Sequence, residues 1–161
     1  MRWAIRLECE GSHESVVVGH IDRQGALQAG TFGMSLIEAK RILHGLQQAV
    51  VQRQMGAHVE TQRPCERCAR RRRLKDYHTA QFQTLFGEVA PCIPRLHRCG
   101  CHSETAATLT LGVEGLGDWI SPELRYVQNE LAATLPYART TVLLGLLLPI
   151  GRGASPEYAR P

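Results

Sequence analysis

The N-terminal segment begins with alternating apolar and polar side chains. In residues 3–9 the apolar side chains fall on every second position, which is the period of a half-buried β-strand. A polar turn at residues 11–15 separates this segment from a β-branched run at residues 16–21. The pattern predicts a β-hairpin. Cys9 lies on the apolar side of its strand, so we expect a buried thiol there.

The next segment has a helical period. Ser35, followed three residues later by Glu38, is a capping-box sequence that opens a helix. Apolar residues then recur at spacings of three and four, with a weaker continuation to about Gly56. Two interpretations stay open: the helix packs on the hairpin, or its wide apolar face over residues 35–56 is a homodimer seam. Gly45 and Gly56 weaken this helix without abolishing it.

A second pattern of strands follows the helix. Pro64 ends the helix, and residues 77–85 then alternate loosely. A turn at residues 86–88 leads into a returning segment at residues 89–96. This predicts a second β-hairpin, preceded by one pair of cysteines and followed by another.

The remaining residues predict a linker and two short helices. Residues 103–120 are rich in Thr, Ala and Gly and read as a linker. The sequence Ser-Pro-Glu at 121–123 is a helix start, because Ser caps the first amides and Pro needs no donor there. This helix is expected to run to about Thr134, before Pro136.

A last apolar segment completes the pattern. We expect Thr140 or Thr141 to cap a short helix that ends at Pro149. Two helices joined by a short turn are typical of a helix-turn-helix, so this part predicts an incomplete one. The Gly- and Pro-rich residues 151–161 are expected to form a disordered tail.

Four of the six cysteines have metal-ligand spacing. Cys65 and Cys68 form a C-x-x-C pair, Cys99 and Cys101 form a C-x-C pair, and thirty residues separate the pairs. A hairpin of this length folds one pair onto the other, and four thiolates close the coordination sphere of Zn²⁺. We therefore predict one structural zinc ion, with no open position for catalysis.

Two alternatives stay open for these cysteines. Cys65 and Cys68 alone could form a redox pair, although the βαβ context of such pairs is missing. A neighbouring group could also replace one ligand; the candidates are His78, His97, His102 and Cys92. Ala69 stands where a metal-binding turn often has glycine.

Positive charge is concentrated around the cysteines. Residues 63–101 hold nine basic and three acidic residues, a net charge of +6, in a chain whose total is +4. Arginine clusters bind phosphate backbones through counterion release and bidentate contacts. The residues that we predict to contact DNA are Arg70, Arg71, Arg72, Arg73, Lys75, Arg95 and Arg98. The alternative is a solvated basic loop.

The predicted elements give an α+β fold in four parts. These are a β-hairpin with an amphipathic helix at 1–62, a zinc ribbon at 63–102, a linker at 103–120 and a helical segment at 121–161. The longest apolar run, at residues 142–148, is far shorter than the roughly 20 residues that span a bilayer. No signal peptide is recognised at the N-terminus. We therefore expect a cytoplasmic protein without a membrane partner.

Seven stretches carry a family resemblance through their order and spacing. They are residues 33–40 (GMSLIEAK), 65–68 (CERC), 77–78 (YH), 84–89 (TLFGEV), 94–101 (PRLHRCGC), 121–126 (SPELRY) and 148–152 (LPIGR). Together they resemble the N-terminal part of ISKra-type insertion-sequence transposases. The resemblance implies a zinc ribbon at Cys65, Cys68, Cys99 and Cys101.

The same resemblance sets expectations about activity. In that family such a region precedes a DDE catalytic domain of RNase H-like fold, which cuts and joins DNA ends during transposition, a form of DNA recombination. This chain stops before such a domain, so we expect a truncated transposase that binds DNA without enzymatic activity, associated with a prokaryotic nucleoid. The alternative from another class is an adaptor whose ribbon and helix bind a protein.

Overall fold

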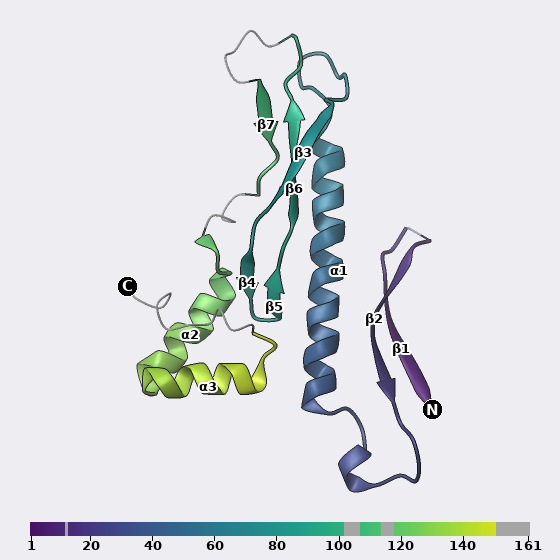
Figure 1. The fold of residues 1–161 in the computed structure, drawn as a ribbon, viewed down its shortest axis with the longest axis vertical. Coiled ribbons are helices and arrows are strands. Elements are labelled where there is room, and N and C mark those ends of the chain that lie inside the picture. Colours follow the sequence, from purple (N-terminus) through teal and green to yellow (C-terminus); the bar gives the residue numbers. More distant parts are fainter. Residues whose placement is uncertain (12, 102–106, 114–117, 151–161) are drawn as a thin grey trace.

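The predicted α+β class is confirmed by a computed structural model that describes all residues except 12, 102–106, 114–117 and 151–161. Figure 1 shows an N-terminal hairpin, one long helix, an antiparallel sheet and a pair of C-terminal helices. His102, an alternative metal ligand, and the predicted disordered tail lie outside the described residues.

The N-terminal hairpin forms as predicted. Strand β1 (Arg2–Glu8) pairs antiparallel with β2 (Ser15–Asp22), and Glu8 and Ser15 are the last partners before the turn. The prediction of a buried Cys9 is wrong. Because pairing stops at Glu8, Cys9 belongs to the turn rather than to the apolar side of the strand, and it is exposed.

Helix α1 (Leu36–Gln62) begins at the predicted capping box. The Ser35 hydroxyl accepts a hydrogen bond from the Glu38 amide, and the Glu38 carboxylate accepts one from the Ser35 amide. The apolar period weakens near Gly56, but the helix continues to Gln62 and ends just before Pro64, as predicted. A short 3₁₀ turn, η1 (Ala29–Thr31), lies in the connection from β2.

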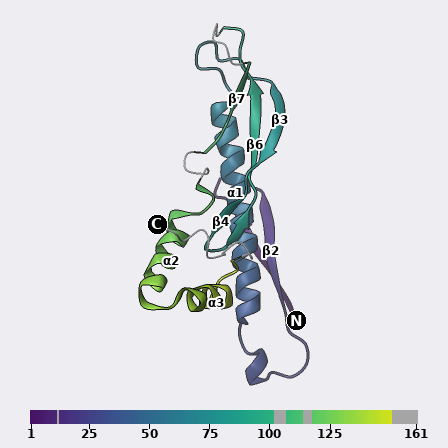
Figure 2. The ribbon, with the colours of Figure 1, turned by 60° about the vertical axis from the view of Figure 1, so that its left-hand side comes forward.

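Helix α1 lies between two parts of the molecule. Figures 1 and 2 both place the N-terminal hairpin on one side of it and the C-terminal helices on the other. A Cβ atom on Gly45 would clash with the carbonyl oxygen of Val18, so glycine permits β2 to approach the helix closely. The interpretation of a helix packed on the hairpin is therefore confirmed, and the homodimer seam stays a prediction.

The second β region is more elaborate than one hairpin. Strands β3 (Leu74–Thr79), β6 (Cys92–His97) and β7 (Thr108–Thr110) form an antiparallel sheet in the order β3-β6-β7. Strands β4 (Phe82–Thr84) and β5 (Gly87–Val89) form a separate two-stranded hairpin. Because Thr84 pairs with Gly87, the turn consists of Leu85 and Phe86 and lies slightly before its predicted position.

Residues 103–120 are not only a linker. Within this segment, residues 108–110 form β7, in which Leu109 pairs with Leu96 of β6. A strand of three residues is too short to show a period in the sequence, and pairing with β6 stabilises it instead. Leu96 and Leu111, which follows β7, are both buried, as is Met55 on α1.

The C-terminal helices are α2 (Pro122–Thr134) and α3 (Tyr137–Leu147). Helix α2 starts as predicted, with the Ser121 hydroxyl accepting from the Leu124 amide. The predicted start of α3 at Thr140 or Thr141 is wrong. Pro136 is the N-cap, so the helix begins earlier. Proline is tolerated at this position because the first amide groups of a helix have no hydrogen-bond partner within the helix.

Helix α3 is joined to the long helix through a side chain. The Lys40 ammonium donates a hydrogen bond of 2.7 Å to the Gly145 carbonyl oxygen. Within α3, the Thr141 hydroxyl donates to the carbonyl oxygen of Tyr137, one turn earlier. In the part of the chain that the structure describes, no helix combines the length and the apolar character that crossing a membrane requires.

Candidate metal centre

The four predicted cysteines come together at one end of the sheet. The Sγ atoms of Cys65, Cys68, Cys99 and Cys101 all lie within 4.8 Å of one another. Cys65 Sγ lies 3.4 Å from Cys101 Sγ, and Cys68 Sγ lies 3.3 Å from Cys99 Sγ. Sulfur ligands at about 2.3 Å from a tetrahedral zinc are about 3.8 Å apart from one another. The cysteines are therefore close enough to hold a metal ion.

The first pair lies in a tight turn that follows α1. The Cys65 amide donates to the Arg70 carbonyl oxygen at 2.9 Å, and the Ala69 amide donates to the Cys65 carbonyl oxygen at 2.7 Å. Pro64 and Arg71 form an isolated β-bridge that closes the loop. Ala69 has a φ of 55°, the left-handed conformation that glycine adopts most readily. The departure from glycine noted in the sequence therefore coincides with a strained backbone position.

The second pair is positioned by the end of β6. The His97 amide donates 2.8 Å to the Arg73 carbonyl oxygen, and the Arg98 amide donates 3.1 Å to the Ala107 carbonyl oxygen. These backbone bonds bring Cys99 and Cys101 over the first turn. The geometry thus arises from the pairing of β6 with the segments that contain β3 and β7.

The arrangement of the sulfur atoms can be compared with the two alternatives, a redox pair of Cys65 and Cys68 or the replacement of one ligand by a neighbouring residue. The contacts of 3.3 and 3.4 Å join one turn to the other, as a shared ion requires, whereas a redox pair would be joined within the first turn. Among the described residues, the cluster contains no histidine and no fifth cysteine, so His78, His97 and Cys92 lie outside it. Cys92, on β6, is exposed.

The thiols differ in their surroundings. Cys65 is only 1% exposed, whereas Cys101 is exposed. A hydrogen bond from the Cys101 amide, and then one from the Cys68 thiol, lower the pKa of Cys99. The neighbouring Cys65 thiol, together with desolvation, raises the pKa of Cys101 to about 12. Thiolates this close repel one another, and a bound cation compensates their charge.

The predicted DNA-contacting residues do not share one environment. Arg95 forms an ion pair with Asp76 of β3, and Arg71 forms one with Glu60 of α1. Arg72 is half-buried and donates 2.9 Å to the Gln62 carbonyl oxygen, and Arg98 is also half-buried. Three others are exposed and, within the described residues, form no ion pair with an acid; they are Arg70, Arg73 and Lys75.

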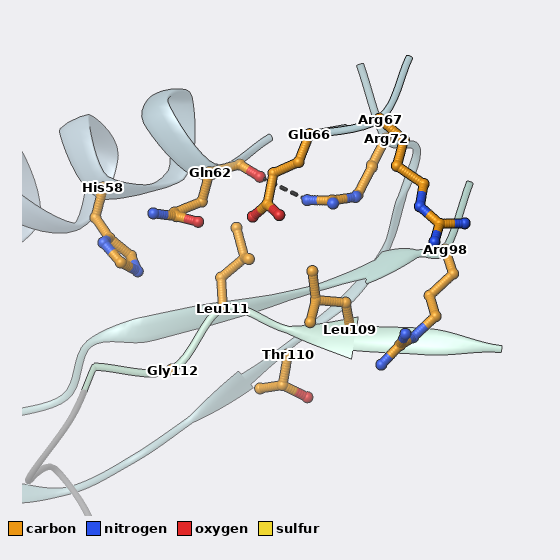
Figure 3. Close-up of a pocket in the computed structure, with 10 residues that line it drawn as sticks. All are labelled: His58, Gln62, Glu66, Arg67, Arg72, Arg98, Leu109, Thr110, Leu111 and Gly112. Carbon is orange, nitrogen blue, oxygen red and sulfur yellow. Dashed lines mark hydrogen bonds between the residues drawn. The ribbon is translucent and has the colours of Figure 1, made fainter. Parts of the chain in front are cut away.

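A pocket beside the cluster includes residues that the sequence interpretation missed. Its volume is about 510 Å³, and Figure 3 shows it between the end of α1 and β7. Arg67 and His58 line it together with Arg72 and Arg98. The sequence contained one signal for Arg67: it lies between Cys65 and Cys68, and a metal-binding turn holds its side chains in fixed positions.

No family model, curated protein or solved structure matches this chain. The functional interpretation therefore depends on the residues of the chain itself.

Proposed function

We propose that the protein binds DNA through a zinc-stabilised basic module formed by residues 63–101, as expected of the N-terminal region of an ISKra-type transposase. The observation that carries the proposal is the group of exposed cations beside the cysteine cluster. Arg70, Arg73 and Lys75 have no acidic partner among the described residues. Their charge is available to a polyanion.

Zinc is the ion that suits the four cysteines best. Thiolate ligands in tetrahedral arrangement select zinc or an iron–sulfur centre, and two close pairs at the ends of a small β structure are typical of zinc ribbons. Four protein ligands leave no position for a reacting water molecule. The ion therefore has a structural role: it joins the turn after α1 to the end of β6.

Binding to the phosphate backbone follows from the position of the cations. Arg70 belongs to the first cysteine turn, Arg73 precedes β3, and Lys75 lies on β3 at the edge of the sheet. Arginine and lysine at such positions neutralise phosphates and release counterions, which gives affinity without sequence preference. We propose no catalysis by this chain.

The experiment that tests the proposal is a salt titration of DNA affinity. Fluorescence anisotropy with a labelled duplex should give affinities that fall linearly on a plot of log affinity against log salt, with duplexes of unrelated sequence behaving alike. A salt-independent affinity, or no binding at low salt, would falsify the proposal.

A second candidate function has one observation in its favour. Large apolar side chains are exposed around the start of α1; they are Leu27, Phe32, Met34, Leu36 and Ile37, with exposed fractions of 47–77%. Such a patch is typical of a surface that binds another protein. Replacing Phe32 and Ile37 by serine separates the two functions, since a DNA-binding role through residues 63–101 leaves duplex affinity unchanged.

A further inference from the structure

The pocket beside the cysteine cluster brings three guanidinium groups together. Arg67 comes from the first cysteine turn, Arg72 from the segment that follows it, and Arg98 directly precedes Cys99. Figure 3 shows the side chains of these three arginines and of Glu66, which also lines the pocket. Among the residues that line the pocket, three are arginines and one is acidic.

Two of these arginines are held by neutral groups. Arg67 Nη1 donates 3.1 Å to the carbonyl oxygen of Cys101, and Arg72 Nη1 donates 2.9 Å to the carbonyl oxygen of Gln62. A carbonyl oxygen orients a guanidinium without cancelling its charge. Since each guanidinium has five N–H donors, both arginines keep donors for a ligand.

The floor of the pocket is apolar. Leu109 and Leu111 come from β7 and the residue after it, and Figure 3 shows both side chains directed toward α1. Leu111 is 5% exposed. An apolar wall beside charged donors lowers the local dielectric constant, so the donors attract an anion more strongly than the same groups would in open water.

We infer that this pocket binds a phosphate group. The fork of N–H donors on arginine matches the oxygen atoms of phosphate, and orientation by Cys101 and Gln62 reduces the entropy lost on binding. The phosphate can be free or can belong to a nucleic-acid strand. Only the second source rests on the proposed DNA-binding function.

The metal centre and the pocket share a framework. Arg67 lies between the ligands Cys65 and Cys68, and its guanidinium is bonded to the carbonyl of the ligand Cys101. An ion that joins the two cysteine turns therefore also fixes the distance between Arg67 and Arg98. Phosphate binding through this pocket requires the metal-bound protein.

Isothermal titration calorimetry with inorganic phosphate tests the pocket directly. The full-length, metal-bound protein is titrated at constant ionic strength, with chloride replaced by phosphate. We expect saturable binding at one site, weakened about tenfold or more in Arg72→Gln and in Arg67→Gln, since each substitution removes charge-assisted hydrogen bonds to the phosphate. Glu66→Gln should bind several-fold more tightly, because it removes the opposing charge.

Controls keep the result interpretable. Arg41→Gln removes an exposed arginine of α1 outside the pocket and should leave phosphate affinity unchanged. Each variant must retain its metal content; if Arg67→Gln loses metal, then Arg72→Gln and Glu66→Gln decide. The inference is overturned if wild-type protein shows no saturable phosphate binding, or if Arg72→Gln and Glu66→Gln bind as wild type does.

The source of the phosphate is distinguished with DNA. If a strand phosphate occupies the pocket, Arg72→Gln and an excess of inorganic phosphate at constant ionic strength should lower duplex affinity by similar factors. If free phosphate is the ligand, Arg72→Gln loses phosphate binding and keeps its duplex affinity. Phosphate binding without any DNA binding would refute the proposed function and uphold the pocket.

Discussion

The guanidinium of Arg95 on β6 hydrogen-bonds to both carboxylate oxygens of Asp76, the residue opposite it on β3. The bond from Arg95 holds the pKa of Asp76 below its usual range, and the same pair raises the pKa of Arg95. Arg95, which the sequence interpretation placed among the DNA-contacting cations, is therefore neutralised by Asp76 in the folded protein. The pair contributes nothing to the net charge of +6 on residues 63–101, and that positive charge comes from the other basic residues of the segment.

This difference between paired and unpaired cations gives the first prediction. Arg70→Gln with Lys75→Gln should weaken binding to all duplex sequences by a similar factor. The slope of log affinity against log salt should flatten by about 0.9 for each phosphate that the variant no longer neutralises. Salt titrations by fluorescence anisotropy measure both quantities.

The matched control removes the Arg95–Asp76 ion pair without changing net charge. Asp76→Asn with Arg95→Gln should leave the salt slope as it is in the wild-type protein. Equal losses of affinity in the two double variants would show that the paired Arg95 contributes to DNA binding as much as the exposed cations do, against this prediction. A loss of affinity limited to one duplex sequence would instead indicate base readout by an arginine.

The second prediction concerns the metal. Protein purified without added metal should contain close to one equivalent of zinc by elemental analysis, and Cys65→Ser or Cys101→Ser should remove it. A strong chelator should also unfold the two cysteine turns, since binding energy is folding energy in small metal modules. Circular dichroism and urea unfolding before and after chelation measure this coupling.

Two cysteines outside the cluster serve as controls for the zinc measurement. Cys9 and Cys92 are exposed and lie outside the group of four. Cys9→Ser and Cys92→Ser should keep the full metal content. If Cys92→Ser loses zinc as Cys101→Ser does, the ligand assignment is wrong.

Local signals in the sequence were sufficient for most of the fold. The capping residues Ser35 and Ser121 predict the starts of α1 and α2, because each satisfies amides that are next to it in the sequence. The spacing of the cysteines likewise predicts the cluster. Helix capping depends on residues a few positions apart. The cysteine spacing follows from the tetrahedral geometry of a bound metal ion.

The parts that the sequence did not predict depend on distant partners. Strand β7 exists because Leu109 meets Leu96, and the charge of Arg95 is compensated by Asp76 through strand register. The pocket of Arg67, Arg72 and Arg98 assembles only when the two cysteine turns meet. None of these relationships leaves a local period or a capping residue in the sequence.

The third prediction concerns the strained residue in the first cysteine turn. Ala69 has a φ of 55°, where a Cβ atom is unfavourable, so Ala69→Gly should stabilise the metal-bound protein by up to about 1 kcal/mol. Ala57→Gly, at an exposed position within α1, should instead cost about 1 kcal/mol. Urea unfolding measures both, and destabilisation by Ala69→Gly would contradict the assigned backbone conformation.

The fourth prediction concerns pH. Hydrogen bonds from Arg23, and then from the Ser35 amide and hydroxyl, hold the pKa of Glu38 far below its usual range. A carboxylate with a lowered folded pKa stabilises the protein above its unfolded pKa of about 4.3 and loses this contribution as the pH falls toward the folded value. Glu38→Gln should therefore be less stable than wild type at neutral pH.

The pH dependence of the stability difference between wild type and Glu38→Gln tests this explanation. Unfolding free energies of wild type and Glu38→Gln should differ by a constant amount above about pH 5 and converge as the pH falls below the unfolded pKa of about 4.3, because the stabilising charge of Glu38 is progressively lost only there. Glutamine can still accept from the Ser35 amide, so the helix cap is kept. A difference that also stays constant below the unfolded pKa would show that the Arg23–Glu38 charge pair is not the cause.

The last prediction compares two glycines of the same helix. Helix propensity alone predicts that Gly45→Ala and Gly56→Ala each stabilise α1 by about 1 kcal/mol. The fold separates them, because a Cβ on Gly45 would clash with the Val18 carbonyl oxygen, whereas a Cβ on Gly56 meets nothing within 4 Å. Gly56→Ala should therefore stabilise the protein. Gly45→Ala should destabilise it by about 1–3 kcal/mol, since the hairpin must move away from α1. Urea unfolding of the two variants measures the contrast, and stabilisation by both would mean that β2 does not pack against the helix in solution.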